Sequence, residues 1–258
     1  IRFPGNDTFT VETSGSEALR IDGSQRLLMG RTSTAAAAGR NSNIQLHSND
    51  ASEASITIRR FFVNTDDNAP PRLVLARSGS NSDDFTIVAD NNRLGEITFA
   101  GADGTDARTE AANIRAEVDG TPGSNDMPGR LIFSTNSGTT DYTERLRIDS
   151  SGRLLVTGGN TSLNVSGFQP NIQVAGTDAD SSAIMTGRFG DNASAPFFIF
   201  HKSRNASING NTVVANNDIL GRVAFYGADG TDYEEAAHIQ CQVDGTPNDD
   251  ATDMPGRL

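Results

Sequence analysis

Short runs in which apolar and polar residues alternate recur along the whole chain, separated by polar turns. In the first half they lie at residues 56–58, 72–75, 86–88, 96–99, 113–118 and 131–133, and matching runs follow in the second half. A period of two over so few residues is typical of β-strands. No stretch of a dozen residues carries the apolar stripe and caps of a helix. We therefore predict an all-β fold, with sandwich or irregular-barrel modules and stalk-like hairpins.

The segment LRIDSSGRLLV, residues 146–156, has the pattern of a β-hairpin. Its apolar positions flank the polar run Asp149–Gly152, and a glycine at the end of such a run readily adopts the positive φ of a tight turn. We predict a hairpin near 146–156 and a second near 19–29. Asp-Gly dipeptides, which also favour tight turns, begin at Asp103, Asp119, Asp229 and Asp244.

Similar segments recur about 126 residues apart, so the sequence contains an internal repeat. LRIDGSQRLL at 19–28 returns as LRIDSSGRLL at 146–155 with 8 of 10 positions identical. Residues 94–106 return at 220–232, and residues 110–122 return at 235–247, each with 9 of 13 positions identical. The hexapeptide DMPGRL occurs whole in both copies. The repeat predicts two copies of one structural unit.

The repeat also predicts how the chain is divided. Residues 1–12 match the end of a preceding unit. Residues 13–139 form the first unit, with its hairpin near 19–29 and a β module at about 40–135. Residues 140–258 form the second, with its hairpin near 146–156 and a β module at about 168–258 that stops before the unit is complete. Because both ends fall inside a unit, we expect a window from a longer tandem array.

Large apolar side chains are scarce. Leu, Ile, Val and Phe together make 55 of 258 residues, close to the roughly 20% below which a charged chain is expected to stay disordered. A single copy would bury little and leave strand edges open to other chains. We expect a homo-oligomer, most economically a trimer, with the apolar face of each hairpin on a shared axis.

The charge and the short apolar runs of the chain argue against nucleic acid and membranes as partners. A net charge of −12 and a pI near 4.6 oppose binding to nucleic acid. No apolar run approaches the roughly 20 residues that span a bilayer, so we expect no membrane insertion. Twenty arginines accompany one lysine, which favours ion pairs between packed surfaces. In particular, we expect Arg130 and Arg257 to bridge to acidic residues of a neighbouring chain.

The tandem LRID hairpins, the preceding strand LIFSTNSG and the spacing segments LGRVAFYGADGTD and EVDGTPGSNDMPGRL together resemble tail-fibre-like proteins of tailed bacteriophages, particularly marine ones. The resemblance covers most of both copies. It implies a homotrimeric, elongated, all-β shaft that joins other virion tail proteins at one end and a receptor-recognising tip at the other. Many such proteins end in a self-cleaving intramolecular chaperone. Nothing in this sequence resembles that chaperone or a tip, so host receptors would be bound by parts outside it.

Candidate metal ligands lie in the repeated GADGTD segment. Asp103 and Asp106 in the first copy, and Asp229 and Asp232 in the second, could offer oxygen ligands to Ca²⁺. The Asp-Gly turn explains the same residues, and neither an EF-hand loop nor a calcium-binding nonapeptide repeat is present. We therefore assign no metal and no cofactor, and keep these four residues as weak calcium candidates.

No residue pattern predicts catalysis. His47, His201 and His238 have no histidine partner in the other copy, and Cys241 aligns with Ala116. Glu234 and Glu235 are adjacent, and adjacent strand residues face opposite ways, which argues against the paired carboxylates of a glycosidase. We therefore predict no catalytic residue and no enzyme activity.

The sequence thus predicts a structural shaft segment of a phage tail fibre that supports host attachment and is located in the virion. The first alternative is a module of a bacterial extracellular filament or surface adhesin. The second is a tailspike that depolymerises glycans.

Overall fold

Short strands form wherever the repeat places an alternating run beside an Asp-Gly turn or an LRID hairpin. The computed structural model describes residues 8–50, 54–61, 70–82, 84–157, 162–247 and 254–258. These residues contain strands and no helix, so the prediction of an all-β fold is confirmed. Within this part of the chain there is consequently no helix that could cross a bilayer.

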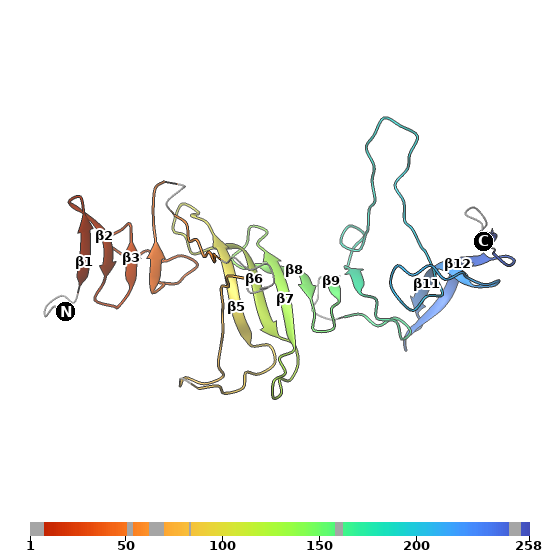
Figure 1. Ribbon diagram of the computed structural model, residues 1–258, viewed down its shortest axis with the longest axis horizontal. Helices are drawn as coiled ribbons and strands as arrows, with labels where there is room; N and C mark the ends of the chain where they lie inside the picture. Colours follow the sequence, from red (N-terminus) through yellow and green to blue (C-terminus); the bar gives the residue numbers. More distant parts are fainter. Residues whose placement is uncertain (1–7, 51–53, 62–69, 83, 158–161, 248–253) are drawn as a thin grey trace. The chain divides into compact units, whose positions relative to one another are not determined.

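The chain divides into two units, residues 1–156 and 157–258 (Figure 1). The first unit holds β1 (Phe9–Thr13), β2 (Ser16–Ile21), β3 (Leu27–Met29), β4 (Ile44–Leu46), β5 (Arg93–Ala100), β6 (Glu110–Val118), β7 (Gly129–Thr135), β8 (Thr143–Ile148) and β9 (Leu154–Thr157). The second unit holds β10 (Ile172–Ala175), β11 (Ile219–Ala228), β12 (Tyr233–Val243) and β13 (Gly256–Arg257). The boundaries of the repeat units, which rest on sequence similarity, remain a prediction.

In the first unit, β1, β2 and β3 pair antiparallel in sequence order, and β4 pairs parallel to β3. Strands β5 to β9 also lie side by side in sequence order, each antiparallel to the next. In the second unit, β11, β12 and β13 pair antiparallel in the same way. The repeat is therefore visible in the pairing, because β11 and β12 take the places of β5 and β6.

Both predicted LRID hairpins are present. Strand β8 pairs with β9, and β2 pairs with β3. In the turn between β8 and β9, the amide of Gly152 donates to the carbonyl of Asp149, and Gly152 has a φ of 76°. The Asp149 carboxylate accepts the amides of Ser151 and Arg153 and so closes the turn from the side. The predicted Asp-Gly turns also form, and the glycine of each has a positive φ.

Three of the strands predicted in the first half, and the runs that match them in the second half, are absent from the sheets. Residues 56–58, 72–75 and 86–88 are extended but belong to no strand. The prediction that they are strands is wrong for the single chain, because an extended segment becomes a strand only when a neighbouring backbone supplies its hydrogen bonds.

The buried apolar core is small. Among the described residues it consists of Leu28, Val88, Val118, Ile132, Leu155, Val214 and Val243. The chain exposes 19647 Å² of surface. A folded monomer of this mass is expected to expose about 11,000 Å². The single chain therefore leaves far more surface open to solvent than a self-contained domain does.

Candidate assembly surface

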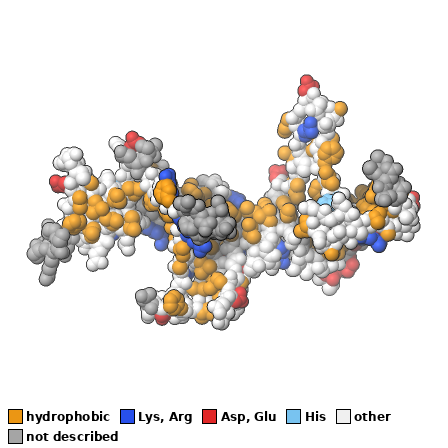
Figure 2. All heavy atoms as spheres, viewed as in Figure 1, with side chains coloured by type: hydrophobic (Ala, Val, Ile, Leu, Met, Phe, Trp, Pro, Cys, Tyr) orange, Lys and Arg blue, Asp and Glu red, His pale blue; other side chains and the backbone are white. Residues whose placement is uncertain are grey.

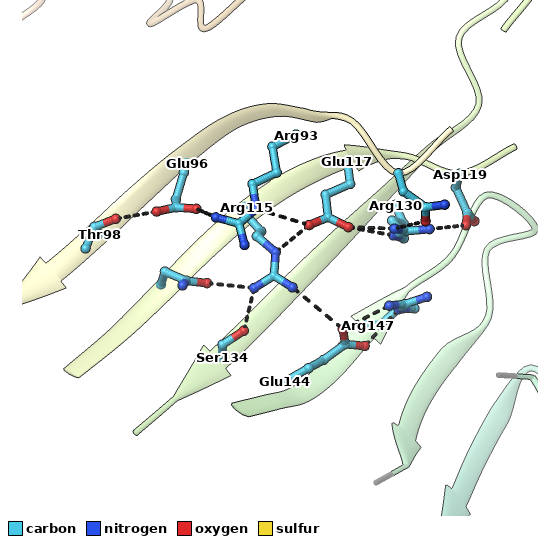
Figure 3. Close-up of polar contacts among 12 residues, drawn as sticks. Arg93, Glu96, Thr98, Arg115, Glu117, Asp119, Arg130, Ser134, Glu144 and Arg147 are labelled. Atoms are coloured by element: carbon cyan, nitrogen blue, oxygen red, sulfur yellow. Dashed lines mark hydrogen bonds and ion pairs between the residues drawn. The ribbon is translucent and has the colours of Figure 1, made fainter. Parts of the chain in front are cut away.

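The sheet of β5 to β8 carries a network of charged side chains on one face (Figure 3). Arg115 and Glu117 lie on β6, where Glu117 accepts a hydrogen bond from Arg115 at 2.7 Å. Arg115 also donates to Ser134 on β7 at 3.0 Å and lies 4.0 Å from Glu144 on β8. Glu144 in turn pairs with Arg147 at 2.8 Å. Ion pairs and hydrogen bonds between side chains therefore connect three neighbouring strands, β6, β7 and β8, in addition to the backbone hydrogen bonds of the sheet.

Arg130 forms a clamp at the end of this network. Its guanidinium donates to Glu117 at 2.6 Å, to Asp119 at 3.0 Å and to the side chain of Asn91 at 2.6 Å. The side chains of Arg130 and Glu117 are only 10% and 8% exposed. One side chain on β7 thus holds the end of β6, the Asp-Gly turn that follows it and the loop that leads into β5.

The second unit contains the same clamp. Arg257 donates to Asp244 at 2.7 Å, to Asn217 at 2.7 Å and to Gln242 at 3.2 Å. Gln242 stands where the first unit has Glu117. Both arginines bind acidic residues of their own unit, and the expected bridge from Arg130 and Arg257 to a neighbouring chain stays a prediction.

The clamp lowers the pKa of its two carboxylates. Burial raises the pKa of Glu117, but hydrogen bonds from Arg130 and Arg115 outweigh burial, and the pKa lies below its usual value. Burial also raises the pKa of Asp119, but hydrogen bonds from Ser150 and Arg130 outweigh it, so this pKa is lowered as well. Both groups are therefore ionised partners of the arginine at neutral pH.

The opposite face of the same sheet is apolar and open. Ile97 and Phe99 on β5 are 48% and 53% exposed, and Leu131 and Ile148 on β7 and β8 are exposed as well. On the charged face, by contrast, Ile132, Ser134, Asn113 and Arg147 are buried. A sheet usually buries its apolar face and leaves its polar face to water. In the single chain this arrangement is reversed.

The other two sheets also carry an exposed apolar face. In the second unit the open face carries Val223, Phe225 and Ile239. In the sheet of β1 to β4, Val11 and Ile21 are exposed, whereas Leu28 on the other face is buried. Figure 2 shows apolar side chains at the surface over β1 and β2. Each sheet thus presents an uncovered apolar surface, which we call its open face.

The four calcium candidates lie in two equivalent turns. One carboxylate oxygen of Asp103 accepts the amides of Thr105 and Asp106, and the other accepts the hydroxyl of Thr109. These hydrogen bonds, led by that from the Asp106 amide, lower the pKa of Asp103.

Asp229 accepts the amides of Thr231 and Asp232 in the same way. In the part of the chain that the structure describes, no three or more His, Cys, Asp or Glu residues are grouped so that they could hold a metal ion. The turn itself accounts for these aspartates, and calcium binding by them remains untested.

Among the described residues, the histidines and the cysteine belong to no group that could hold a metal ion. His238 and Arg222 both contact the carboxylate of Glu235. His47 has a lowered pKa because of burial and the nearby positive charge of Arg31. Cys241 is a free, half-buried thiol on β12.

Two glutamine side chains, which the sequence analysis did not identify, hold nearby backbone segments through hydrogen bonds. The side-chain oxygen of Gln45 accepts the amide of Ala35, and its nitrogen donates to the carbonyl of Ser42. Gln173 forms the equivalent bonds to Leu163 and Pro170. The recurrence of Ile-Gln at the same place in both copies was the available signal.

Comparison with known proteins gives a likeness of fold. No family model matches the chain, and no curated protein sequence matches it. Among solved structures, it is similar to the carboxy-terminal domain of the bacteriophage T5 L-shaped tail fibre, with a TM-score of 0.58 and 13% identity over 77% of this chain and 80% of that one. A structure of that domain with its intramolecular chaperone domain gives a TM-score of 0.60 and 15% identity over 78% of this chain and 55% of that one. At such identity the likeness concerns the fold.

Proposed function

We propose that this chain is a structural segment of a tail fibre shaft, located in the virion of a tailed bacteriophage and assembled from copies of itself, most economically three. The observation that carries the proposal is the open face of each sheet. Apolar side chains of every sheet remain in water on this face, and in the sheet of β5 to β8 the charged side chains of the other face are largely buried. Burying apolar surface against another chain is the main favourable term available to such a protein.

Self-association fits the repeat better than a foreign partner does. All three sheets carry an open face of the same kind, so an assembly in which equivalent sheets meet covers all three faces by one arrangement. A cyclic arrangement does this without leaving an unpaired face at either side. The likeness of fold to the T5 fibre domain supports a fibre of this kind. Attachment to other tail proteins and to a host receptor would then involve parts of the fibre outside residues 1–258, and the shaft itself would have no catalytic role.

Sedimentation of the purified chain tests the proposal. We expect a particle whose mass is three times 27.3 kDa at micromolar concentration, and a rod in electron micrographs. A single subunit that sediments alone and unfolds cooperatively at that concentration would refute the proposal. Genes for other virion proteins beside this gene would separate a phage fibre from a bacterial filament. Depolymerisation of a polysaccharide by the purified chain would favour the tailspike instead.

A further inference from the structure

Two stretches of extended backbone at equivalent places in the repeat lie outside every sheet. They are residues 72–75 in the first unit, which follow the sequence Ala-Pro-Pro, and residues 197–200 in the second, which follow Ala-Pro. We call them the apolar limbs. In Figure 1 the second limb belongs to the long segment between β10 and β11 that runs out and back without forming a strand. Within the part of the chain that the structure describes, neither limb makes a backbone hydrogen bond.

The limbs are apolar on both sides. Successive residues of an extended chain point in opposite directions, so Phe197 and Ile199 face one way and Phe198 and Phe200 face the other. The first three of these side chains are 72% to 74% exposed. Leu73 and Val74 in the first limb are exposed to about the same degree. Strands that are apolar on both sides are typical of positions covered on both faces.

A close crossing fixes the end of each limb. A Cβ placed on Gly221 of β11 would lie 2.5 Å from the Cβ of Phe200, and one placed on Gly95 of β5 would lie 2.6 Å from the Cβ of Leu75. Only glycine lets the limb approach the sheet so closely at these two positions. The limb is therefore held against the sheet at one end, while its remaining apolar side chains extend into solvent.

We infer that the apolar limbs are interchain strands, each packed between neighbouring copies of this chain. The inference rests on the proposed self-assembly and names the segments that carry it. Unpaired backbone groups and two apolar sides call for a partner with free strand backbone and apolar side chains, and a second copy offers both. A ring of three gives each limb a different neighbour on either side, whereas a two-fold dimer gives every chain one neighbour.

The exposed area agrees with an extensive contact. The chain exposes 19647 Å², against about 11,000 Å² expected for a folded monomer of its mass. The excess is several times the roughly 800 Å² that each partner buries in a specific interface of standard size. The limbs and the open faces both carry exposed large apolar side chains, so contacts through the limbs add to those through the open faces.

Hydrogen exchange of the full chain at micromolar concentration tests the inference. We expect the amides of residues 197–200 to exchange about a hundredfold or more slowly than in the unfolded chain. The exposed amides of Thr140 and Asp141 serve as the internal reference for fast exchange. If the protein is oligomeric and the limb amides exchange as fast as these reference amides, the inference is overturned while self-assembly stands. A monomeric chain overturns both.

A substitution adds a second arm to the test. Phe198→Asp places a charge on the limb, and because Phe198 is 74% exposed in the single chain, the fold of the unit should tolerate it. We expect association at least about tenfold weaker, because a buried charge without a partner opposes packing. Asn211→Asp, at an exposed polar position of the same long segment, and Phe198→Leu should both assemble as the wild type does.

Protection of the amides of β12 shows that each variant is folded. Unchanged assembly of Phe198→Asp, with unchanged exchange of its limb, would contradict the inference.

Discussion

Replacing Glu117 by alanine removes the centre of the charged network. Glu117 accepts one hydrogen bond from Arg115 at 2.7 Å and two from Arg130 at 2.6 and 3.0 Å. The side chains of the two arginines are 11% and 10% exposed. Removing one partner of a buried ion pair costs about 3 to 5 kcal/mol, because the remaining charge stays buried without compensation. Arg130 keeps Asp119 and Arg115 keeps Ser134, so we expect a loss at the lower end, about 3 kcal/mol.

Denaturant unfolding at one fixed protomer concentration measures this loss, since assembly makes apparent stability depend on concentration. Glu117→Gln is the matched control, because the second unit has Gln242 at this place, where it accepts a hydrogen bond from Arg257. The amide keeps an acceptor for the arginine, and we expect a loss of about 1 to 2 kcal/mol. A Glu117→Ala protein within about 0.5 kcal/mol of the wild type would refute the reasoning, as would a Gln variant as unstable as the Ala variant.

Three further predictions concern pH, packing and calcium. Because the folded-state pKa values of Glu117 and Asp119 are lowered, their contribution to stability is complete above the unfolded-chain values of about 4 and is lost as pH falls through the folded values. The melting temperature should therefore decrease as the pH is lowered below about 4. A melting temperature that stays constant down to about pH 2 contradicts this assignment. Gly221→Ala should destabilise by about 1 to 3 kcal/mol in denaturant unfolding, because its methyl group would meet the crossing limb, whereas Gly227→Ala on the same strand has open space and should cost less. Chelation with EGTA should leave the melting temperature unchanged, because the turn occupies the carboxylate oxygens of Asp103; a fall that added Ca²⁺ reverses would instead establish a calcium site.

Local chemistry explains what the sequence predicted correctly about the fold. The LRID hairpins and the Asp-Gly turns depend on a side-chain carboxylate and a residue with positive φ within a few positions. That residue is glycine in the Asp-Gly turns and in the second hairpin, where the sequence reveals it, and Gln25 in the first hairpin. The strands predicted from their pattern at 96–99, 113–118 and 131–133 form because their neighbours along the chain supply their hydrogen bonds. Segments 72–75 and 56–58 have the same alternation but no partner strand within the described chain, so the period alone could not separate them from true strands.

The sequence by itself determined the repeat, the all-β character, the turns and the shortage of apolar side chains, because each depends on residue identity and short-range geometry. Tertiary structure decided which face of each sheet is covered. It brought Arg130 to Glu117 and Asp119 of its own unit, contacts that sequence reasoning had not predicted. The physical reason is that an alternating strand has two faces of known composition, and only the packing of distant segments decides which of the two remains in water.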